Sequence, residues 1–311
     1  MMHCGDISLS VPSKTFLVGE YAVLERFCAI LLNTSPKFRL DCSLVGGSAN
    51  SDNALHISRQ SPFFVLVHSY ADVFSHYRLK FSDPHLGSGG FGASSAKFLM
   101  AYRAMTLIKN EKFNISKTLE YYREISCESG VEGHAKPSGA DVVAQYSGGV
   151  TYLSPASDPK DIGWPFEDIA ALIFKTSVKI QTYKHLEGLG RKQFQLSGKA
   201  EYPALSSVID MAYQAFTDKS SDLLIKAVNK YAELMLDMKL VHPDTKTILD
   251  ELRKSQDVLA AKGCGALGAD VILVLCNSTN KEQTKTFATG LGLTYVSSSD
   301  NLSSGLEFVI Q

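Results

Sequence analysis

Apolar and polar residues alternate along residues 7–11, whose sequence is Ile-Ser-Leu-Ser-Val. Alternation with a period of two predicts a β-strand with one buried face. Runs of apolar, β-branched and aromatic residues between polar or turn-forming stretches predict further strands. They lie within the segments 28–43, 54–81 (including the apolar run 63–67), 169–174, 271–276, 293–297 and 306–310.

Longer segments rich in helix formers predict helices. A run without breakers follows residue 96, and Ser116 is a candidate N-cap for a helix over 119–125. Further helices are predicted at 204–217, 220–239, 245–262 and 281–290.

The stretch 154–165 is rich in proline, serine and aspartate and predicts a domain boundary. A chain of 311 residues fits two domains better than one. We therefore expect an N-terminal domain at 1–160 and a C-terminal domain at 161–311. In the second domain the order strand-helix-helix-strand-helix-strand predicts a ferredoxin-like α+β arrangement.

Composition excludes several classes of partner. The formal net charge is −1, so no basic excess favours nucleic acid or an anionic membrane surface. No apolar run approaches the length that spans a bilayer, and we expect no membrane partner. The 6 cysteines are scattered without a Cys-x-x-Cys pair, which argues against a zinc site or a disulfide framework. The first residues lack a signal-peptide pattern, so we expect a cytoplasmic protein.

The chain is organised around the glycine-rich stretch 83–96, Asp-Pro-His-Leu-Gly-Ser-Gly-Gly-Phe-Gly-Ala-Ser-Ser-Ala. Glycines let the backbone approach a ligand closely and adopt positive φ. The helix formers that follow place this loop at a helix N-terminus, where free N–H groups and the helix dipole favour an anion such as phosphate. A loop that only turns the chain is the simpler alternative.

Two general nucleotide motifs fit this loop incompletely. Gly87 to Ser94 matches the P-loop pattern except that Ala93 stands where the lysine is required. Gly87, Gly89 and Gly92 match the dinucleotide fingerprint, but that fingerprint should open the first βα unit of the chain. If the loop binds phosphate through its backbone, we expect Lys97 to add little to the affinity.

Two further stretches carry ionisable residues in apolar surroundings. Lys14 and Glu20 lie in the mostly apolar segment 12–24, where a charge is costly unless it is paired or used. A mutual ion pair or exposure to solvent would also explain them. Asp141 follows the small residues of 134–140 and opens an apolar segment. An aspartate there is commonly a helix cap.

These segments resemble, in order, the motifs of the GHMP kinases, a family that includes galactokinase, homoserine kinase, mevalonate kinase and phosphomevalonate kinase. Residues 12–23 resemble Pro-Gly-Lys-x-x-Leu-x-Gly-Glu-His-Ala-Val, with Ser13 and Tyr21 as departures. Residues 90–96 resemble the loop Gly-Leu-Gly-Ser-Ser-Ala. Residues 262–270 resemble the third motif, Gly-Ala-Gly-Gly-Gly, with Leu267 and Ala269 in place of glycines. We expect close backbone approach to be reduced there.

The resemblance is closest to mevalonate kinase and phosphomevalonate kinase. Residues 134–141 are similar to the mevalonate kinase run His-Gly-Asn-Pro-Ser-Gly-x-Asp, with Ala135 and Lys136 as departures. The family implies a two-domain α+β fold, in which the N-terminal domain is like domain 2 of ribosomal protein S5 and the C-terminal domain is ferredoxin-like. It also implies ATP and Mg²⁺, a small-molecule substrate, and it allows a homodimer.

The resemblance assigns roles to individual residues. Asp141 and Lys14 would be catalytic, and Ser94 and Glu132 would bind magnesium, although Glu132 does not have the expected spacing. The predicted ATP-binding residues are Gly87, Gly89, Gly90, Gly92, Ala93, Ser94 and Ser95. The predicted substrate-binding residues are Glu20, His134, Ser138 and Thr182.

The substrate is the least determined part of this interpretation. The run 134–141 and the short chain favour conversion of mevalonate to 5-phosphomevalonate, a step of isoprenoid precursor synthesis. Tyr21 after Gly19-Glu20, and Asp270 after the third motif, favour 5-phosphomevalonate as the substrate. The altered glycines leave a third alternative, a protein of this fold that binds a ligand without catalysis.

Overall fold

The computed structural model describes residues 5–45, 58–59, 61–127, 137–176 and 201–311. The strands are β1 (Ile7–Val18), β2 (Ala29–Leu44), β3 (Tyr77–Ser82), β4 (Val150–Ser154), β5 (Ser157–Asp161), β6 (Ile169–Lys175), β7 (Val258–Cys264), β8 (Val271–Asn277), β9 (Thr294–Ser298) and β10 (Glu307–Ile310). The helices are α1 (Pro62–Ser69), α2 (Ala71–Phe74), α3 (Ala93–Ile108), α4 (Ile115–Cys127), α5 (Ala140–Ser147), α8 (Glu201–Asp218), α9 (Ser221–Asp237), α10 (Pro243–Leu252) and α11 (Lys281–Gly290).

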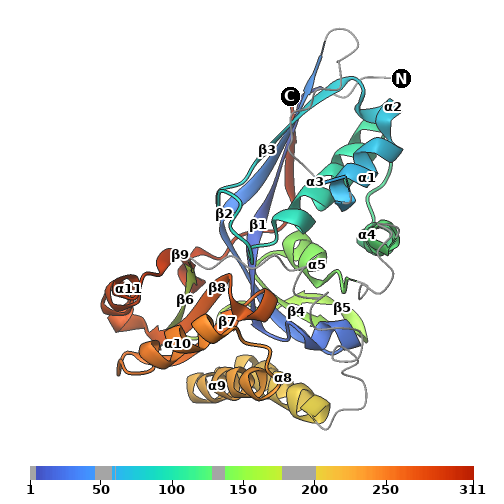
Figure 1. The fold of residues 1–311 in the computed structure, drawn as a ribbon. Coiled ribbons are helices and arrows are strands. Elements are labelled where there is room, and N and C mark those ends of the chain that lie inside the picture. The colour runs from blue at the N-terminus through green and yellow to red at the C-terminus, as the bar shows by residue number, and fades with distance from the viewer. Residues whose placement is uncertain (1–4, 46–57, 60, 128–136, 177–200) are drawn as a thin grey trace.

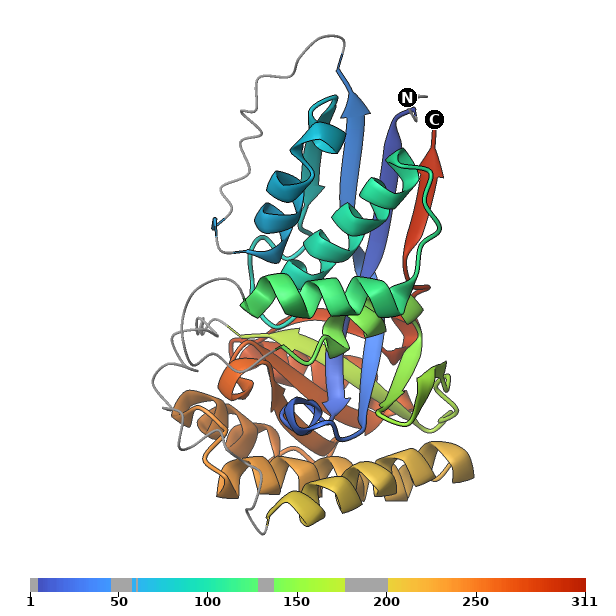
Figure 2. The same ribbon diagram turned by 90° about the vertical axis from the view of Figure 1, so that its right-hand side faces the viewer.

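The first sheet is built around the long strand β2. One end of β2 pairs with β3 and the other with β4, while β1 pairs along almost its whole length. The strand order is β10-β1-β2-β4-β5, with β3 also on β2. Helices α1 and α3 lie on one side of the long strands, and α4 crosses in front of them (Figures 1 and 2).

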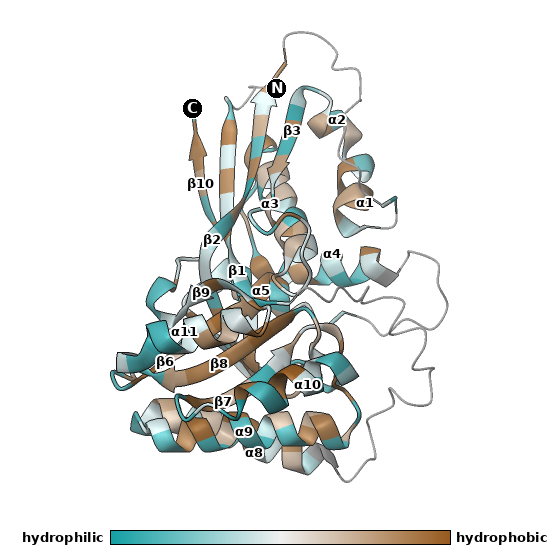
Figure 3. Ribbon diagram, turned by 60° about the vertical axis from the view of Figure 1, so that its left-hand side comes forward, coloured by the Kyte–Doolittle hydropathy of each residue, from teal (hydrophilic) through white to brown (hydrophobic). Residues whose placement is uncertain are grey.

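The second sheet has the antiparallel order β7-β8-β6-β9. This is the order of a ferredoxin-like unit, and the predicted α+β fold class is confirmed. Strand β8 is apolar from Val271 to Cys276 (Figure 3), and both of its faces are buried there. Val271, Leu273 and Leu275 join the main core, whereas Ile272 and Val274 pack in a second core with residues of α10 and α11. None of the helices in these described ranges is both long and apolar enough to cross a membrane.

Two predicted elements were wrong in type. The run 63–67, predicted as a strand, lies in helix α1, because Ser61 accepts a hydrogen bond from Phe64 N (3.2 Å) and Pro62 occupies the first turn. The helix predicted over 245–262 ends at Leu252, and 258–264 forms β7. The alanine-rich segment becomes a strand because it pairs with β8, so tertiary context overrides helix propensity.

The predicted cap of α4 was also wrong. The helix begins at Ile115, one residue before Ser116. Asn114 caps it instead, because its Oδ1 accepts a hydrogen bond from Lys117 N at 3.0 Å. The strand predicted at 7–11 extends to Val18 as β1, and the segment 54–81 contains α2 as well as α1, with β3 as its strand. The remaining predicted helices and strands are confirmed at or near their predicted bounds.

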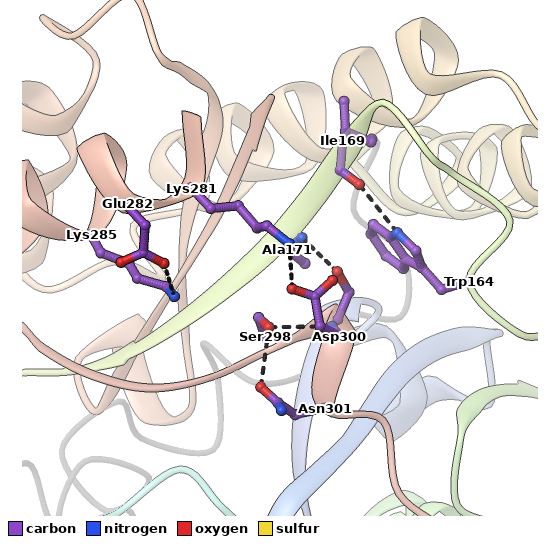
Figure 4. Close-up of polar contacts among 10 residues, drawn as sticks. Trp164, Ile169, Ala171, Lys281, Glu282, Lys285, Ser298, Asp300 and Asn301 are labelled. Carbon is purple, nitrogen blue, oxygen red and sulfur yellow. Dashed lines mark hydrogen bonds and ion pairs between the residues drawn. The ribbon is translucent and has the colours of Figure 1, made fainter. Parts of the chain in front are cut away.

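Polar contacts organise the chain around β6 and the turn after β9 (Figure 4). Ser299 Oγ accepts a hydrogen bond from Ala171 N on β6 (3.1 Å), and Lys281 Nζ on α11 pairs with Asp300 at 2.5 Å. Beyond this turn the chain leaves the second sheet. Ser303 N donates a hydrogen bond to Asn33 O, and Ser303 O accepts one from Gly149 N, both in the first unit. Strand β10 then pairs with β1.

The predicted division at residues 160 and 161 stays a prediction. The stretch that we proposed as the boundary contains the end of β4 and the whole of β5, and both strands belong to the first sheet. The C-terminal strand β10 returns to that sheet as well.

The segment between β9 and β10 packs against the first sheet and α5, and Gly305 within it allows a test of this packing. A Cβ on Gly305 would lie 1.9 Å from Tyr146 O, a backbone atom at the end of α5. Gly305→Ala should therefore lower the free energy of unfolding by about 1–3 kcal/mol. Urea denaturation followed by circular dichroism measures the shift.

Gly290→Ala is the matched control, because no atom lies within 4 Å of its added Cβ. Alanine near the end of α11 should raise stability slightly, by about 0.5 kcal/mol. Equal midpoints for Gly305→Ala and the wild type would show that the docking is looser than described.

Candidate active site

A cavity of about 670 Å³ lies where the predicted motif segments converge. Its walls come from β1, the loop 83–92, the first turns of α3 and α5, and the loop 265–270 that precedes β8. The six predicted loop residues from Gly87 to Ser94 all line it: Gly87, Gly89, Gly90, Gly92, Ala93 and Ser94.

The Asp83 carboxylate holds the loop backbone through two hydrogen bonds. Its Oδ1 accepts a hydrogen bond from His85 N (2.8 Å) and its Oδ2 accepts one from Gly87 N (3.0 Å). Gly92 precedes α3 with φ +88°, and a Cβ there would lie 2.9 Å from Gln145 Nε2 and 3.0 Å from Lys14 Cγ. Glycine is therefore required at this position for both backbone conformation and space.

The two serines after the loop differ in environment. Ser94 is exposed to the cavity. Ser95 is only 2% exposed, and its single hydroxyl proton is shared between Gly92 O (2.9 Å) and Gln145 Oε1 (2.8 Å). The Ser95 side chain thus supports the loop, and only its backbone N–H remains to serve the predicted ATP site.

Lys14 and Asp141 come together in the cavity wall. Lys14 Nζ lies 3.1 Å from Asp141 Oδ1; the lysine side chain is 7% exposed and the aspartate side chain 35%. Strand β1 positions the lysine, since Lys14 N donates to Phe91 O of the loop (3.1 Å). The N-terminal turn of α5 positions the aspartate after Gly139, whose φ is +76°. One carboxylate oxygen is held by the ammonium while the group keeps access to the cavity.

Glu20 lines the same cavity but has a partner that the sequence did not indicate. Its Oε1 pairs with Lys262 Nζ of β7, and both side chains are buried (8% and 1% exposed). Lys262 Nζ also donates to Phe16 O (3.3 Å) and lies 3.2 Å from Cys264 Sγ. The carboxylate of Glu20 is therefore neutralised by an ion pair between the two sheets.

Ser138 lines the cavity beside Asp141. Its hydroxyl oxygen accepts a hydrogen bond from Ala140 N (3.2 Å), and its carbonyl oxygen accepts one from Arg123 Nε (3.2 Å). The other predicted substrate and metal residues, His134, Thr182 and Glu132, lie outside the described residues. Among the residues that are described, no three histidine, cysteine or acidic side chains cluster as metal ligands. Ser94 is the predicted magnesium ligand that the structure places at the cavity.

The third motif, residues 262–270, has glycines at the two positions where its own backbone segments contact each other, Gly263 and Gly268. A Cβ on Gly263 would lie 2.3 Å from Gly268 O. Leu267 adopts φ +51°, which costs a non-glycine residue about 1–2 kcal/mol, whereas Ala269 has an ordinary helical conformation. Close backbone approach is thus kept between Gly263 and Gly268, and the reduced approach expected at Leu267 and Ala269 stays a prediction.

Two residues of the site were missed from sequence. Tyr122 of α4 lines the cavity, and burial, with the nearby charge of Asp141, raises its pKa well above its usual value, so it stays a neutral phenol. Gln145 is fully buried and bonds the loop and β1. Its position one helical turn after Asp141 was a usable signal, because residues i and i+4 share a helix face.

His85 supports the loop from the protein interior. Its ring stacks on Phe91 (centroids 3.9 Å apart), and its Nε2 lies 2.6 Å from Ser13 Oγ. Ser13 donates its own proton to Pro36 O (2.7 Å), so Nε2 of a neutral ring must donate to Ser13. Burial lowers the pKa of His85 from 6.5 to about 4, with Lys175 adding to the effect and Asp83 opposing it.

This shift predicts a pH dependence of stability. Between about pH 6.5 and pH 4 the unfolded chain binds a proton that the native chain excludes, so native stability falls as the pH falls. From about pH 7.5 to pH 5 the wild type should lose about 2 kcal/mol through this group. His85→Gln, measured in parallel by urea denaturation, should lack that part of the loss. Parallel pH profiles for the two proteins would contradict the buried neutral ring.

Comparison with known proteins gives a fold rather than a close relative. No family model and no curated protein matches the sequence. Solved structures match almost the whole chain. A mevalonate kinase from Methanococcus jannaschii has a TM-score of 0.71 at 15% identity, covering 96% of this chain and 98% of its own. The phosphomevalonate kinase of Streptococcus pneumoniae has a TM-score of 0.72 at 15% identity, covering 95% and 99%.

A third match extends the comparison to a sugar kinase. The galactokinase of Lactococcus lactis, solved with galactose, has a TM-score of 0.74 at 12% identity and covers 97% of this chain and 95% of its own. Identities this low establish the fold and not the activity. The three enzymes are GHMP kinases, and the chain has the two-domain α+β fold of that family.

Proposed function

We propose that this protein is an ATP-dependent kinase that phosphorylates a hydroxyl group of a small metabolite. The observation that carries the proposal is the Lys14–Asp141 pair, at 3.1 Å, in the wall of a cavity that the glycine loop also lines. Phosphoryl transfer asks a protein mainly to position two substrates and to stabilise charge. A carboxylate, an ammonium and a phosphate-binding loop around one cavity meet those needs.

The loop provides the nucleotide side of the reaction. Gly92 brings the chain into α3 with positive φ, so the amides of the first turn are directed to the cavity end of the helix. Such amides and the helix dipole bind phosphate groups. At Gly87 the loop faces open space, since no atom lies within 4 Å of an added Cβ there.

Asp141 provides the substrate side. In the proposed step the substrate hydroxyl oxygen bonds to the terminal phosphorus of ATP, and the bond from that phosphorus to the bridging oxygen breaks. ADP leaves with the electron pair, and the hydroxyl proton moves to the Asp141 carboxylate. Lys14 orients that carboxylate and stabilises the negative charge that develops on the transferring group.

Magnesium would neutralise phosphate charge, and Ser94, which is exposed at the cavity, would contact it. We further propose that the substrate is mevalonate. The run 134–141, similar to the mevalonate kinase motif, and the short chain support mevalonate over 5-phosphomevalonate. The paired Lys14 and Asp141 argue against a binding protein without catalysis.

The first test concerns the loop. Gly92→Val should abolish detectable ATP binding in calorimetry, because its side chain would displace Gln145 and Lys14. Gly163→Val is the control: it has a similar positive φ (+61°) but no atom within 4 Å of its Cβ. Full ATP affinity in Gly92→Val would exclude the loop as the nucleotide site.

The second test concerns Asp141. The expected cap role is wrong, because Gly139 is the N-cap of α5 and has no side chain that could cap the helix. If Asp141 only complemented the helix dipole, Asp141→Asn would be mild, at about 0.3–1 kcal/mol. As proton acceptor, its loss should lower kcat by roughly 10² to 10⁴, while ATP affinity and melting temperature stay near wild type. ADP release with a panel of hydroxy acids, including mevalonate and 5-phosphomevalonate, measures turnover.

Lys14→Met should lower kcat by a comparable factor. The double variant with Asp141→Asn should be little worse than either single variant, since residues that act as a unit are not additive. Normal turnover in Asp141→Asn would show that the catalytic assignment is wrong. ATP binding without turnover on any substrate of the panel would favour the ligand-binding alternative.

A further inference from the structure

Lys97 faces the cavity from the second turn of α3. It follows Ala93 by four residues, so the two positions lie on the same side of the helix, and both line the cavity. Ala93 is the position at which a P-loop would carry its lysine. Long side chains in helices lean toward the N-terminus, which directs the Lys97 ammonium back along α3 toward the loop.

The environment of Lys97 keeps its ammonium at the cavity wall. Lys97 Nζ lies 4.6 Å from the centroid of the Phe81 ring at the end of β3. A cation over an aromatic face is stabilised without being neutralised. Burial lowers the pKa of Lys97 and the charge of Asp83 opposes that effect, so the ammonium has lost part of its hydration before any ligand binds.

The charges around the cavity leave Lys97 available for an anion. Lys14 is held by Asp141. Asp83 is the acidic residue whose charge raises the pKa of Lys97. Its two carboxylate oxygens already accept hydrogen bonds from the backbone N–H groups of His85 and Gly87. Among the described lining residues, Lys97 is the lysine without an ion pair. A polyphosphate on the loop would be the natural counter-charge.

We propose that Lys97 binds the polyphosphate of the nucleotide, one helical turn after the place where a P-loop carries its lysine. The inference rests on the proposed kinase function and adds to it a cation from α3. It reverses our expectation from sequence that Lys97 contributes little, because the sequence alone did not show the side chain at the cavity.

Calorimetric titration of ATP and of adenosine, in buffer containing magnesium, separates a phosphate contact from a contact to the base or ribose. Lys97→Met should weaken ATP binding about 10- to 100-fold and leave adenosine affinity unchanged. Lys97→Arg should keep most of the ATP affinity, because arginine retains the positive charge. Lys112→Met, an exposed lysine beyond the far end of α3, should behave as wild type for both ligands.

Three results would overturn the inference. Unchanged ATP affinity in Lys97→Met would exclude the contact, and equal weakening of ATP and adenosine would show that Lys97 acts on the base or on the fold. If Lys97→Met fails to fold, Lys97→Gln provides the same comparison. A wild-type protein that binds no ATP would overturn the proposed function itself and the inference with it, whereas wild-type binding with an insensitive Lys97 overturns the inference alone.

Discussion

One buried amide keeps the segments of the cavity in register. Gln145 is fully buried on α5; its Nε2 donates to Pro12 O (3.0 Å) and Gly92 O (3.1 Å), and its Oε1 accepts from Ser95 (2.8 Å). Strand β1, the glycine loop and α3 therefore meet at a single side chain. A buried polar group with both ends satisfied permits few alternative arrangements. Because Asp141 lies one turn earlier on α5, its distance from the loop is fixed by the same contact.

The second sheet completes the cavity from the other side. Lys262 of β7 reaches Glu20 in a buried ion pair. The carboxylate of Asp270, just before β8, lies where a Cβ on Gly89 would be, with its Cγ 2.6 Å away. The glycine loop can therefore contact β8 only without a side chain at this position. The site depends on both sheets, and a displacement of one against the other would alter the loop and the substrate side together.

Sequence reasoning succeeded where a short segment determines its own backbone. The glycine loop, the helix that follows it, and the position of Asp141 at the start of a helix were accessible from local patterns. The strand predicted at 7–11 runs on to Val18 and carries Lys14. Sequence reasoning failed where a residue far along the chain determines the local structure or the pairing of a side chain. The sequence of β7 predicts a helix, but the segment forms a strand because it pairs with β8. Nothing in the sequence around Glu20 indicates its ion pair with Lys262, which lies far along the chain. Tyr122 was missed because facing a cavity is a property of the assembled fold.

The pairing of β1 with β10 has a consequence for biosynthesis. During translation the strands β1 to β5 leave the ribosome first, whereas β10 follows the entire second sheet. The first sheet can form its central pairs early, but the outer edge of β1 stays open until the last strand arrives. An unpaired edge is a template for pairing with other chains, and domains that wait for late segments are exposed in this way while they fold. The nascent chain must therefore keep an incomplete sheet soluble through the synthesis of its second half.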